Sequence, residues 1–121
     1  MAEAYKLQMQ TPSHQEAPFD DRFAWLVEAE TSQRMNRKLK RLVASARMPE
    51  LATMEEFDFN SDRGLDRAFV CGLSRCEWVR THLNLLIVGP TGVGKTYLAC
   101  AMGTEACRHR MSVVFRKVSE L

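Results

Sequence analysis

The stretch that decides the fold is Gly89-Pro90-Thr91-Gly92-Val93-Gly94-Lys95-Thr96, because it matches the phosphate-loop pattern G-x-x-x-x-G-K-[ST] in full. Its glycines allow backbone conformations closed to other residues, so successive amide groups can turn inward and form a concave anion site. We expect Lys95 to bring a positive charge to the β- and γ-phosphates of a nucleotide and Thr96 to present its hydroxyl to magnesium. Thr91 and Val93 shape the loop without a chemical role. All eight residues, Pro90 included, are candidates for nucleotide binding.

The segments on either side of the loop predict its structural context. Asn84–Val88 is a short apolar run rich in β-formers and predicts a buried strand. A helix is expected from about Gly94 to His109, with Leu98, Ala101, Met102 and Ala106 on one face, followed by a second strand at 112–116 and a further helix starting at Ser119. This strand, loop and helix order predicts an α/β fold of the phosphate-loop type. The alternative is a glycine-rich turn that merely joins strand to helix.

The N-terminal half predicts a separate helical module. Residues 1–18 show no helical period and are expected to be a mobile tail. From Phe19, with Asp20 and Asp21 in the first turn, apolar residues recur at helical spacing up to Pro49, as one long helix or as two helices separated at 31–33. The expected organisation is a tail over 1–18, a helical module with an acidic connector over 19–60, and a phosphate-loop domain over 61–121.

Two further segments link these parts. Residues 50–60 read as an acidic connector in which Phe57 and Phe59 act as apolar anchors. A second helix is expected after it, because its apolar residues recur at i, i+3, i+4, i+8 and i+11, at Leu65, Ala68, Phe69, Leu73 and Cys76.

Composition narrows the class of protein. Of the 121 residues, 45% are apolar and 26% charged, which is typical of globular domains. The longest uninterrupted apolar run, Leu85–Val88, is far short of a membrane span, and we expect a cytoplasmic protein. The cysteines at 71, 76, 100 and 107 form no zinc-binding pattern and are expected to be reduced core thiols.

The net charge of +2 conceals a segregation of charges. Residues 31–47 carry only bases and residues 48–62 only acids. The bases Arg34, Arg37, Lys38, Lys40 and Arg41 are candidates for contact with a DNA backbone, since charge neutralisation dominates non-specific binding. Pairing with the acidic segment, or with an acidic partner, is the alternative. No paired carboxylates follow an apolar strand, and no catalytic residue is predicted.

Beyond these separate signals, the chain resembles the IstB-like ATP-binding proteins. The resemblance covers about residues 19–121. It is carried by the phosphate loop with its flanks at 84–101, by Phe19-Asp20-Asp21-Arg22-Phe23, and by further segments at 26–30, 34–39, 57–59, 63–66, 76–79 and 106–108. That family consists of helper ATPases encoded by bacterial insertion sequences and is similar to the DnaC helicase loaders.

The resemblance implies an N-terminal helical module followed by the first β-α-β part of an AAA+ domain. It also implies ATP and magnesium as ligands, self-association, binding of double-stranded DNA and a partner transposase. Family members carry an acidic magnesium-holding residue, sensors and an arginine finger beyond this region. Past Thr96 the only acids are Glu105 and Glu120, so we expect nucleotide binding without appreciable hydrolysis.

The resemblance also has an implication for the β-sheet. In AAA+ domains the first two strands in sequence are not neighbours in the sheet, because strands from later in the chain lie between them. Strand 84–88 could pair directly with 112–116, but a two-stranded sheet with one helix buries little surface. We expect the chain to be a fragment. Two alternatives stay open: part of a DnaC-like helicase loader, or a non-enzymatic helical module that binds DNA or a partner and has a vestigial phosphate loop.

Overall fold

The computed structural model describes residues 1–60 and 64–121 and divides the chain into two compact units, Met1–Lys38 and Leu39–Leu121. Asp62 of the acidic segment and Arg63 of the family resemblance lie outside the described residues. No helix in the described part of the chain combines the length and the apolar character needed to cross a membrane.

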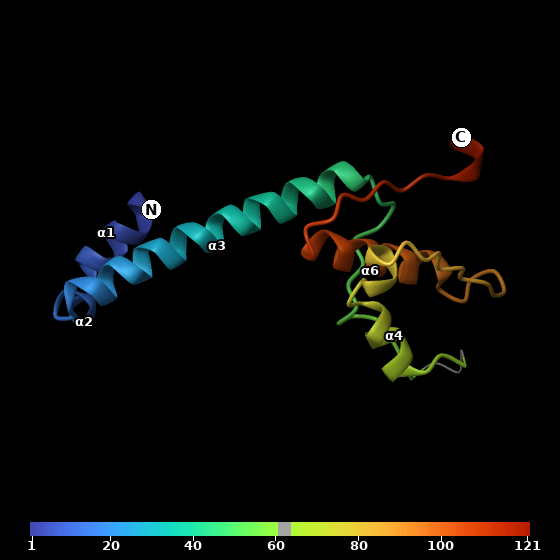
Figure 1. The fold of residues 1–121 in the computed structure, drawn as a ribbon, viewed down its shortest axis with the longest axis horizontal. Helices are drawn as coiled ribbons and strands as arrows, with labels where there is room; N and C mark the ends of the chain where they lie inside the picture. Colours follow the sequence, from blue (N-terminus) through green and yellow to red (C-terminus); the bar gives the residue numbers. More distant parts are fainter. Residues whose placement is uncertain (61–63) are drawn as a thin grey trace. The chain divides into compact units, whose positions relative to one another are not determined.

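The first unit contains two short helices that the sequence did not predict. They are α1 (Ala2–Gln10) and α2 (Pro12–Gln15), and in Figure 1 both lie beside the first turns of α3 (Phe19–Ala46). Gln8 is buried and donates from Nε2 to the Arg22 carbonyl at 2.8 Å. The expectation of a segment without helix at 1–18 was therefore wrong. A search for an apolar period misses such a helix, because here a buried polar side chain makes the contact with α3.

Helix α3 is one continuous helix of 28 residues. The polar residues at 31–33 do not interrupt it, and the Thr31 hydroxyl donates to the Val27 carbonyl one turn back, at 2.8 Å. Asp20 and Asp21 lie in its first turn, as predicted. The helix ends at Ala46, before Pro49, and Arg47 leaves it with a positive φ of 53°.

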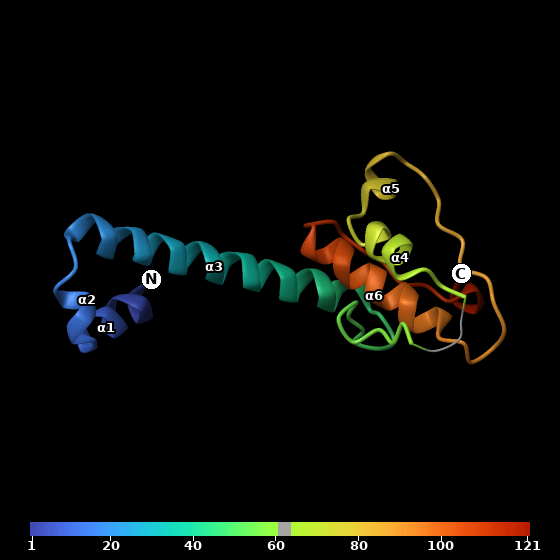
Figure 2. The ribbon, with the colours of Figure 1, turned by 90° about the horizontal axis from the view of Figure 1, so that it is seen from below.

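The second unit is built around α6 (Lys95–Arg108), with α4 (Arg67–Leu73), α5 (Glu77–Arg80) and a 3₁₀ turn (Val118–Glu120). Figure 2 shows α6 between α4 and the connector of residues 50–60. The predicted helix over 94–109 is confirmed, with Gly94 and His109 as its caps. Its buried residues lie on more than one face: Leu98, Cys100, Ala101, Met102, Ala106 and Cys107. A helix apolar on several faces occupies the centre of a fold.

Apolar side chains from the connector, α4 and α6 form the core. One cluster joins Phe57 to Val70, Leu98 and Met102, and a second joins Ala52 to Cys100 and Ala101. Phe57 is 6% exposed and packs edge-on against Phe59, with 4.8 Å between ring centroids. The prediction that Phe57 and Phe59 anchor the connector is confirmed.

The predicted apolar face of the second helix was right only in part: Leu73 packs against the core cluster and Cys76 is buried, but the rest of the face differs. Helix α4 is only seven residues long, so Leu65 and Cys76 lie outside it, and Phe69 is 63% exposed. Val70 is the buried residue instead. Asp66 caps the N-terminus by accepting from the Ala68 amide, and Cys76 turns the chain in the left-handed region. Packing against Phe57 and Leu98 sets the rotation of so short a helix.

Neither predicted strand forms in the described residues, so the structure does not show the β-α-β part of the expected fold. Burial nevertheless alternates as in a strand: Leu85 and Ile87 are half-buried, whereas Leu86 and Val88 are more than 80% exposed. Residues 112–116 alternate in the same way. The two segments do not pair with each other, and without a partner a β-forming sequence has no ladder to join.

The four cysteines are free thiols, as predicted from their spacing. Cys76, Cys100 and Cys107 are buried and Cys71 is exposed, so the core assignment holds for three of them. Burial raises the pKa of each of the three buried thiols. They are therefore neutral near pH 7 and act as small apolar side chains.

Candidate functional site

The glycine-rich loop leads directly into the N-terminus of α6. Gly92 and Gly94 have φ values of 82° and 95°, in the left-handed region that favours glycine. Gly89 differs, because its φ is not positive. Glycine is favoured there because a side chain has little room: an added Cβ would lie 3.2 Å from Val93 Cγ1. Two of the three glycines thus supply the expected conformational freedom, and the third lets the loop fold closely on itself.

The first turn of α6 provides donors for an anion. Gly94 caps the helix without a side-chain hydrogen bond, and the first amide bonded back into the helix is that of Leu98, which donates to the Gly94 carbonyl at 3.0 Å. The amides of the preceding residues have no acceptor within the helix. Together with the positive end of the helix dipole, they form the kind of site that binds phosphate.

Lys95 folds back over the loop that precedes it. Its ammonium donates to the Gly89 carbonyl at 2.6 Å and to the Pro90 carbonyl at 2.7 Å. The cation is therefore held at the loop by neutral carbonyl oxygens. Because a phosphate oxygen is a stronger acceptor than a carbonyl, an incoming phosphate can take over these hydrogen bonds. Thr96 is exposed, and its hydroxyl makes no hydrogen bond within the described part of the chain, so it is available to a hydrated metal ion.

An apolar pocket of about 120 Å³ lies beside the loop. Phe57 and Leu65 contribute one part of its lining, and Ile87, Val93 and Leu98 contribute apolar side chains from the loop and its flanks. The pocket also reaches the backbone of the loop at Gly89 and Gly94 and the side chain of Lys95. It is too small for a whole nucleotide but suited to one flat apolar group.

Phe57 and Leu65 were missed as site residues in the sequence. Both were assigned to packing, one as a connector anchor and the other as part of a helix face. The available signal was an aromatic residue within an acidic segment, which marks contact with something apolar but does not say with what. Only the folded chain places these residues next to the phosphate loop.

Two acids near α6, Glu55 and Glu105, are engaged in ion pairs, whereas Glu56 accepts from the Tyr97 hydroxyl in the first turn of α6 at 3.5 Å. Arg108 donates to Glu55 and to Glu105, both at 2.7 Å, and its guanidinium holds the pKa of Glu55 below the usual range. Glu105 lies nine positions after Thr96, about 14 Å along the helix axis. No group of three or more metal-binding side chains occurs among residues 1–60 and 64–121.

The five predicted basic residues all belong to α3. Arg34, Arg37 and Lys38 belong to the first unit, and Lys40 and Arg41 to the second. All five are exposed. Arg34 forms an ion pair with Glu30 at 2.9 Å, and Glu30 also accepts from the N-terminal ammonium, which is the main cause of its lowered pKa.

The remaining four predicted bases, Arg37, Lys38, Lys40 and Arg41, have no ion-pair partner among the described residues. The alternative, in which the basic block pairs with the acidic segment, is not seen for Glu55, because Glu55 pairs with Arg108.

Comparison with known proteins gives the family. The family model of the IstB-like ATP binding proteins matches residues 1–121. An insertion sequence ATP-binding protein of Sinorhizobium fredii, y4pL, is 45% identical over 79% of this chain and 39% of the relative. The ATP-binding protein of insertion sequence IS1162 from Pseudomonas fluorescens is 36% identical over the whole chain and 53% of the relative.

A third relative, the ATP-binding protein of insertion sequence IS21 from Pseudomonas aeruginosa, is 35% identical over 78% of this chain and 36% of the relative. The chain thus spans between about a third and a half of the length of these curated relatives. With the match of the family model over its full length, the chain belongs to the family of IstB-like ATP-binding proteins.

Proposed function

We propose that this chain binds ATP through residues 89–96. The observation that carries the proposal is the joining of three features: a loop with two left-handed glycines, the free N-terminus of α6, and the Lys95 ammonium held over the loop. The printed names of the relatives, ATP-binding proteins of insertion sequences, support the choice of nucleotide. In this reading the phosphates occupy the loop and the base lies against Phe57 in the apolar pocket.

Magnesium enters the proposal through Thr96. Its exposed hydroxyl has no competing hydrogen bond in the described structure, which fits a ligand of a hydrated ion. When bound with the nucleotide, magnesium neutralises charge on the β- and γ-phosphates. The chain's own contributions are the backbone amides, the Lys95 cation and this hydroxyl.

We further propose that residues 1–121 alone bind ATP without turning it over. Hydrolysis needs an oriented water and charge stabilisation in the transition state. Glu105 is committed to Arg108 at the far end of α6, and Glu120 lies in the 3₁₀ turn. The Glu105 carboxylate is therefore not available to orient a water at the loop. The whole-protein roles that the family resemblance implies also remain proposals: helper ATPase in transposition, self-association and contact with a transposase in the cytoplasm, with a helicase-loader role as the alternative.

Thermal unfolding of the full chain with magnesium and ATP tests nucleotide binding. At 100 times its dissociation constant, ATP should raise the free energy of unfolding by about 2.7 kcal/mol. Adenosine is the matched control, because it carries the base without phosphates and should produce little stabilisation. Phosphate release in the same samples should stay at background. Equal stabilisation by adenosine, or none by ATP, would contradict the proposal.

A second candidate function is contact with double-stranded DNA through α3. The observation that favours it is the exposure of Arg37 and Lys38, which have no ion-pair partner in the described chain. If these cations neutralise phosphates, Arg37→Ala/Lys38→Ala should lower the slope of log affinity against log salt by about 1.8. Fluorescence anisotropy of a labelled duplex measures this slope. An unchanged slope would exclude Arg37 and Lys38 as phosphate contacts. These two residues would then no longer support the alternative of a non-enzymatic DNA-binding module.

A further inference from the structure

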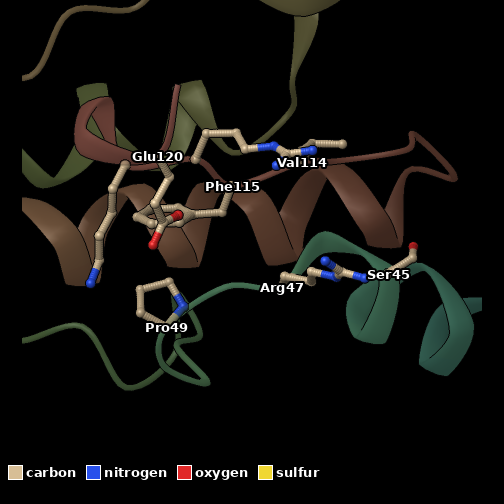
Figure 3. A pocket seen from close by; sticks show the side chains of 8 residues that line it. Ser45, Arg47, Pro49, Val114, Phe115 and Glu120 are labelled. Atoms are coloured by element: carbon tan, nitrogen blue, oxygen red, sulfur yellow. The ribbon is translucent and has the colours of Figure 1, made fainter.

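A second pocket lies at the end of α3, remote in sequence from the phosphate loop. It measures about 520 Å³, within the range of about 300 to 1,000 Å³ that is usual for sites of small ligands. Residues 45–49 supply one wall and residues 114–120 the other, and all of them belong to the second unit. Figure 3 shows Ser45, Arg47 and Pro49 on one side and Val114, Phe115 and Glu120 on the other. The size of this pocket suits a whole small molecule rather than a single ion.

The core of the second unit holds the two walls in place. The Phe115 amide donates to the Ala46 carbonyl at 2.9 Å, which ties the C-terminal segment to the end of α3. The Phe115 side chain is half-buried, because it packs against the second apolar cluster of the core and also lines the pocket. Since packing already restricts this ring, a flat ligand group that lies against it loses little side-chain freedom on binding. The pocket therefore has a preformed apolar part, to which Pro49 adds a second ring.

Three cations line the same pocket without counter-charges. Arg47, Arg116 and Lys117 are exposed and form no ion pair with any described residue. Elsewhere in the same unit the arginines at 80 and 108 do pair with glutamates. Cations gathered without counter-charges raise the local positive potential, which an anion relieves. Guanidinium groups suit a phosphate in particular, because their paired donors match its oxygens.

The pocket also contains one carboxylate, that of Glu120, which forms no ion pair with any described residue. The Glu120 amide donates to the Lys117 carbonyl at 2.9 Å, so the 3₁₀ turn fixes the backbone of the acid relative to that of the cation. A carboxylate repels a continuous chain of phosphates but accepts hydrogen bonds from hydroxyl and amino groups. The lining therefore favours a small ligand with a phosphate at one end and uncharged donors at the other.

The charge of the lining indicates how many phosphates the ligand carries. Three cations and one carboxylate give the lining a net charge of +2. A single phosphate monoester carries a charge of about −1.5 to −2 near pH 7 and therefore matches it. The lining thus combines an aromatic surface, a hydrogen-bond acceptor and the counter-charge for one phosphate.

We propose that this pocket is a second ligand site, which binds a nucleoside monophosphate. The base lies against Phe115, and hydroxyl or amino groups of the nucleoside donate to the Glu120 carboxylate. Arg47, Arg116 and Lys117 hold the phosphate. The inference goes beyond the proposed function and does not depend on it, because none of these residues belongs to the loop at 89–96.

Isothermal titration of the full chain with AMP tests this site. AMP lacks the β- and γ-phosphates that the loop lysine is expected to bind, so Lys95→Ala should leave its affinity unchanged. Arg116→Ala/Lys117→Ala removes two cations of the pocket from an exposed segment outside the helices and should weaken AMP binding by about 10-fold, because charge-assisted hydrogen bonds are lost. The matched control is Lys6→Ala/Arg75→Ala, which removes two exposed, unpaired cations that do not line the pocket and should have no effect.

Two further probes test the parts of the ligand. Inorganic phosphate and adenosine should each bind more weakly than AMP, since each makes only some of its contacts. Inorganic phosphate that binds as tightly as AMP would overturn the proposal in favour of a plain anion site, and adenosine that binds as tightly would mean that the cations take no part. Crosslinking with 8-azido-AMP and mapping of the labelled peptide should place the base at residues 114–120.

The remaining outcomes separate this site from the phosphate loop. Loss of AMP binding in Lys95→Ala, or a crosslink at residues 89–98, would place AMP at the loop and overturn the inference. Equal losses in the pocket variant and its control, or no AMP binding at all, would also overturn it. Stabilisation by ATP should weaken in Lys95→Ala and persist in the pocket variant, so that failure of either proposal is recognised independently of the other.

Discussion

Lys95→Ala should weaken ATP binding by about 100-fold, a loss of about 3 kcal/mol, because two charge-assisted hydrogen bonds to phosphate are worth about 1.5 kcal/mol each. The ammonium is already held at the loop by the Gly89 and Pro90 carbonyls, so it needs only to exchange acceptors when phosphate arrives. Isothermal titration of the full chain with magnesium and ATP measures the loss.

Two controls define what Lys95 contributes. Lys6→Ala removes an exposed lysine from α1 and should leave ATP affinity unchanged. Lys95→Arg keeps the charge but changes its shape, and it should recover only part of the affinity because a planar guanidinium does not replace a compact ammonium. Thermal unfolding without ATP checks that each variant is folded. Full affinity in folded Lys95→Ala would mean that the phosphates do not lie in this loop.

Phe57→Ala should lower the free energy of unfolding by about 3 to 5 kcal/mol, the usual cost of removing a buried aromatic side chain. Phe57 joins the connector to Val70, Leu98 and Met102, and its ring also stacks near Tyr97, with 6.2 Å between centroids. Since α6 begins at Lys95, loss of this cluster also removes the support of the phosphate loop. Urea unfolding followed by circular dichroism gives the measurement.

A matched pair of variants checks that packing causes this effect. Phe69 is 63% exposed on α4, so Phe69→Ala should cost less than about 1 kcal/mol. Phe57→Leu retains most of the buried volume and should cost less than about 1.5 kcal/mol. Similar losses for the variants at 57 and 69 would show that the cluster does not hold the second unit together.

Much of the helical structure could be predicted from local sequence. The bounds of α6, the acidic first turn of α3 and its end before Pro49 follow from residues close to one another in the chain. A helix closes its hydrogen bonds four residues apart, so its signals are contained in a short window. The phosphate-loop pattern is local in the same sense, because each glycine conformation depends on its own backbone.

The candidate site could be predicted only in part. The residues at 89–96 were identified from their spacing, but the wall formed by Phe57 and Leu65 was not, because more than 20 residues separate each of them from the loop glycines that it faces. The buried face of α4 was likewise misassigned, since seven residues do not define a period firmly enough to outweigh packing.

The sequence by itself determined the phosphate loop, the helix that follows it, the start and the end of α3 and the family to which the chain belongs. Only the tertiary structure decided that residues 84–88 and 112–116 stay unpaired, that α1 and α2 form, and that Arg47 meets Arg116 and Lys117 at one pocket. The physical reason is the range of the interactions involved. Helix and loop conformations are set by residues close together in the sequence. Strand pairing and pocket formation instead depend on contacts between segments that are far apart in the sequence.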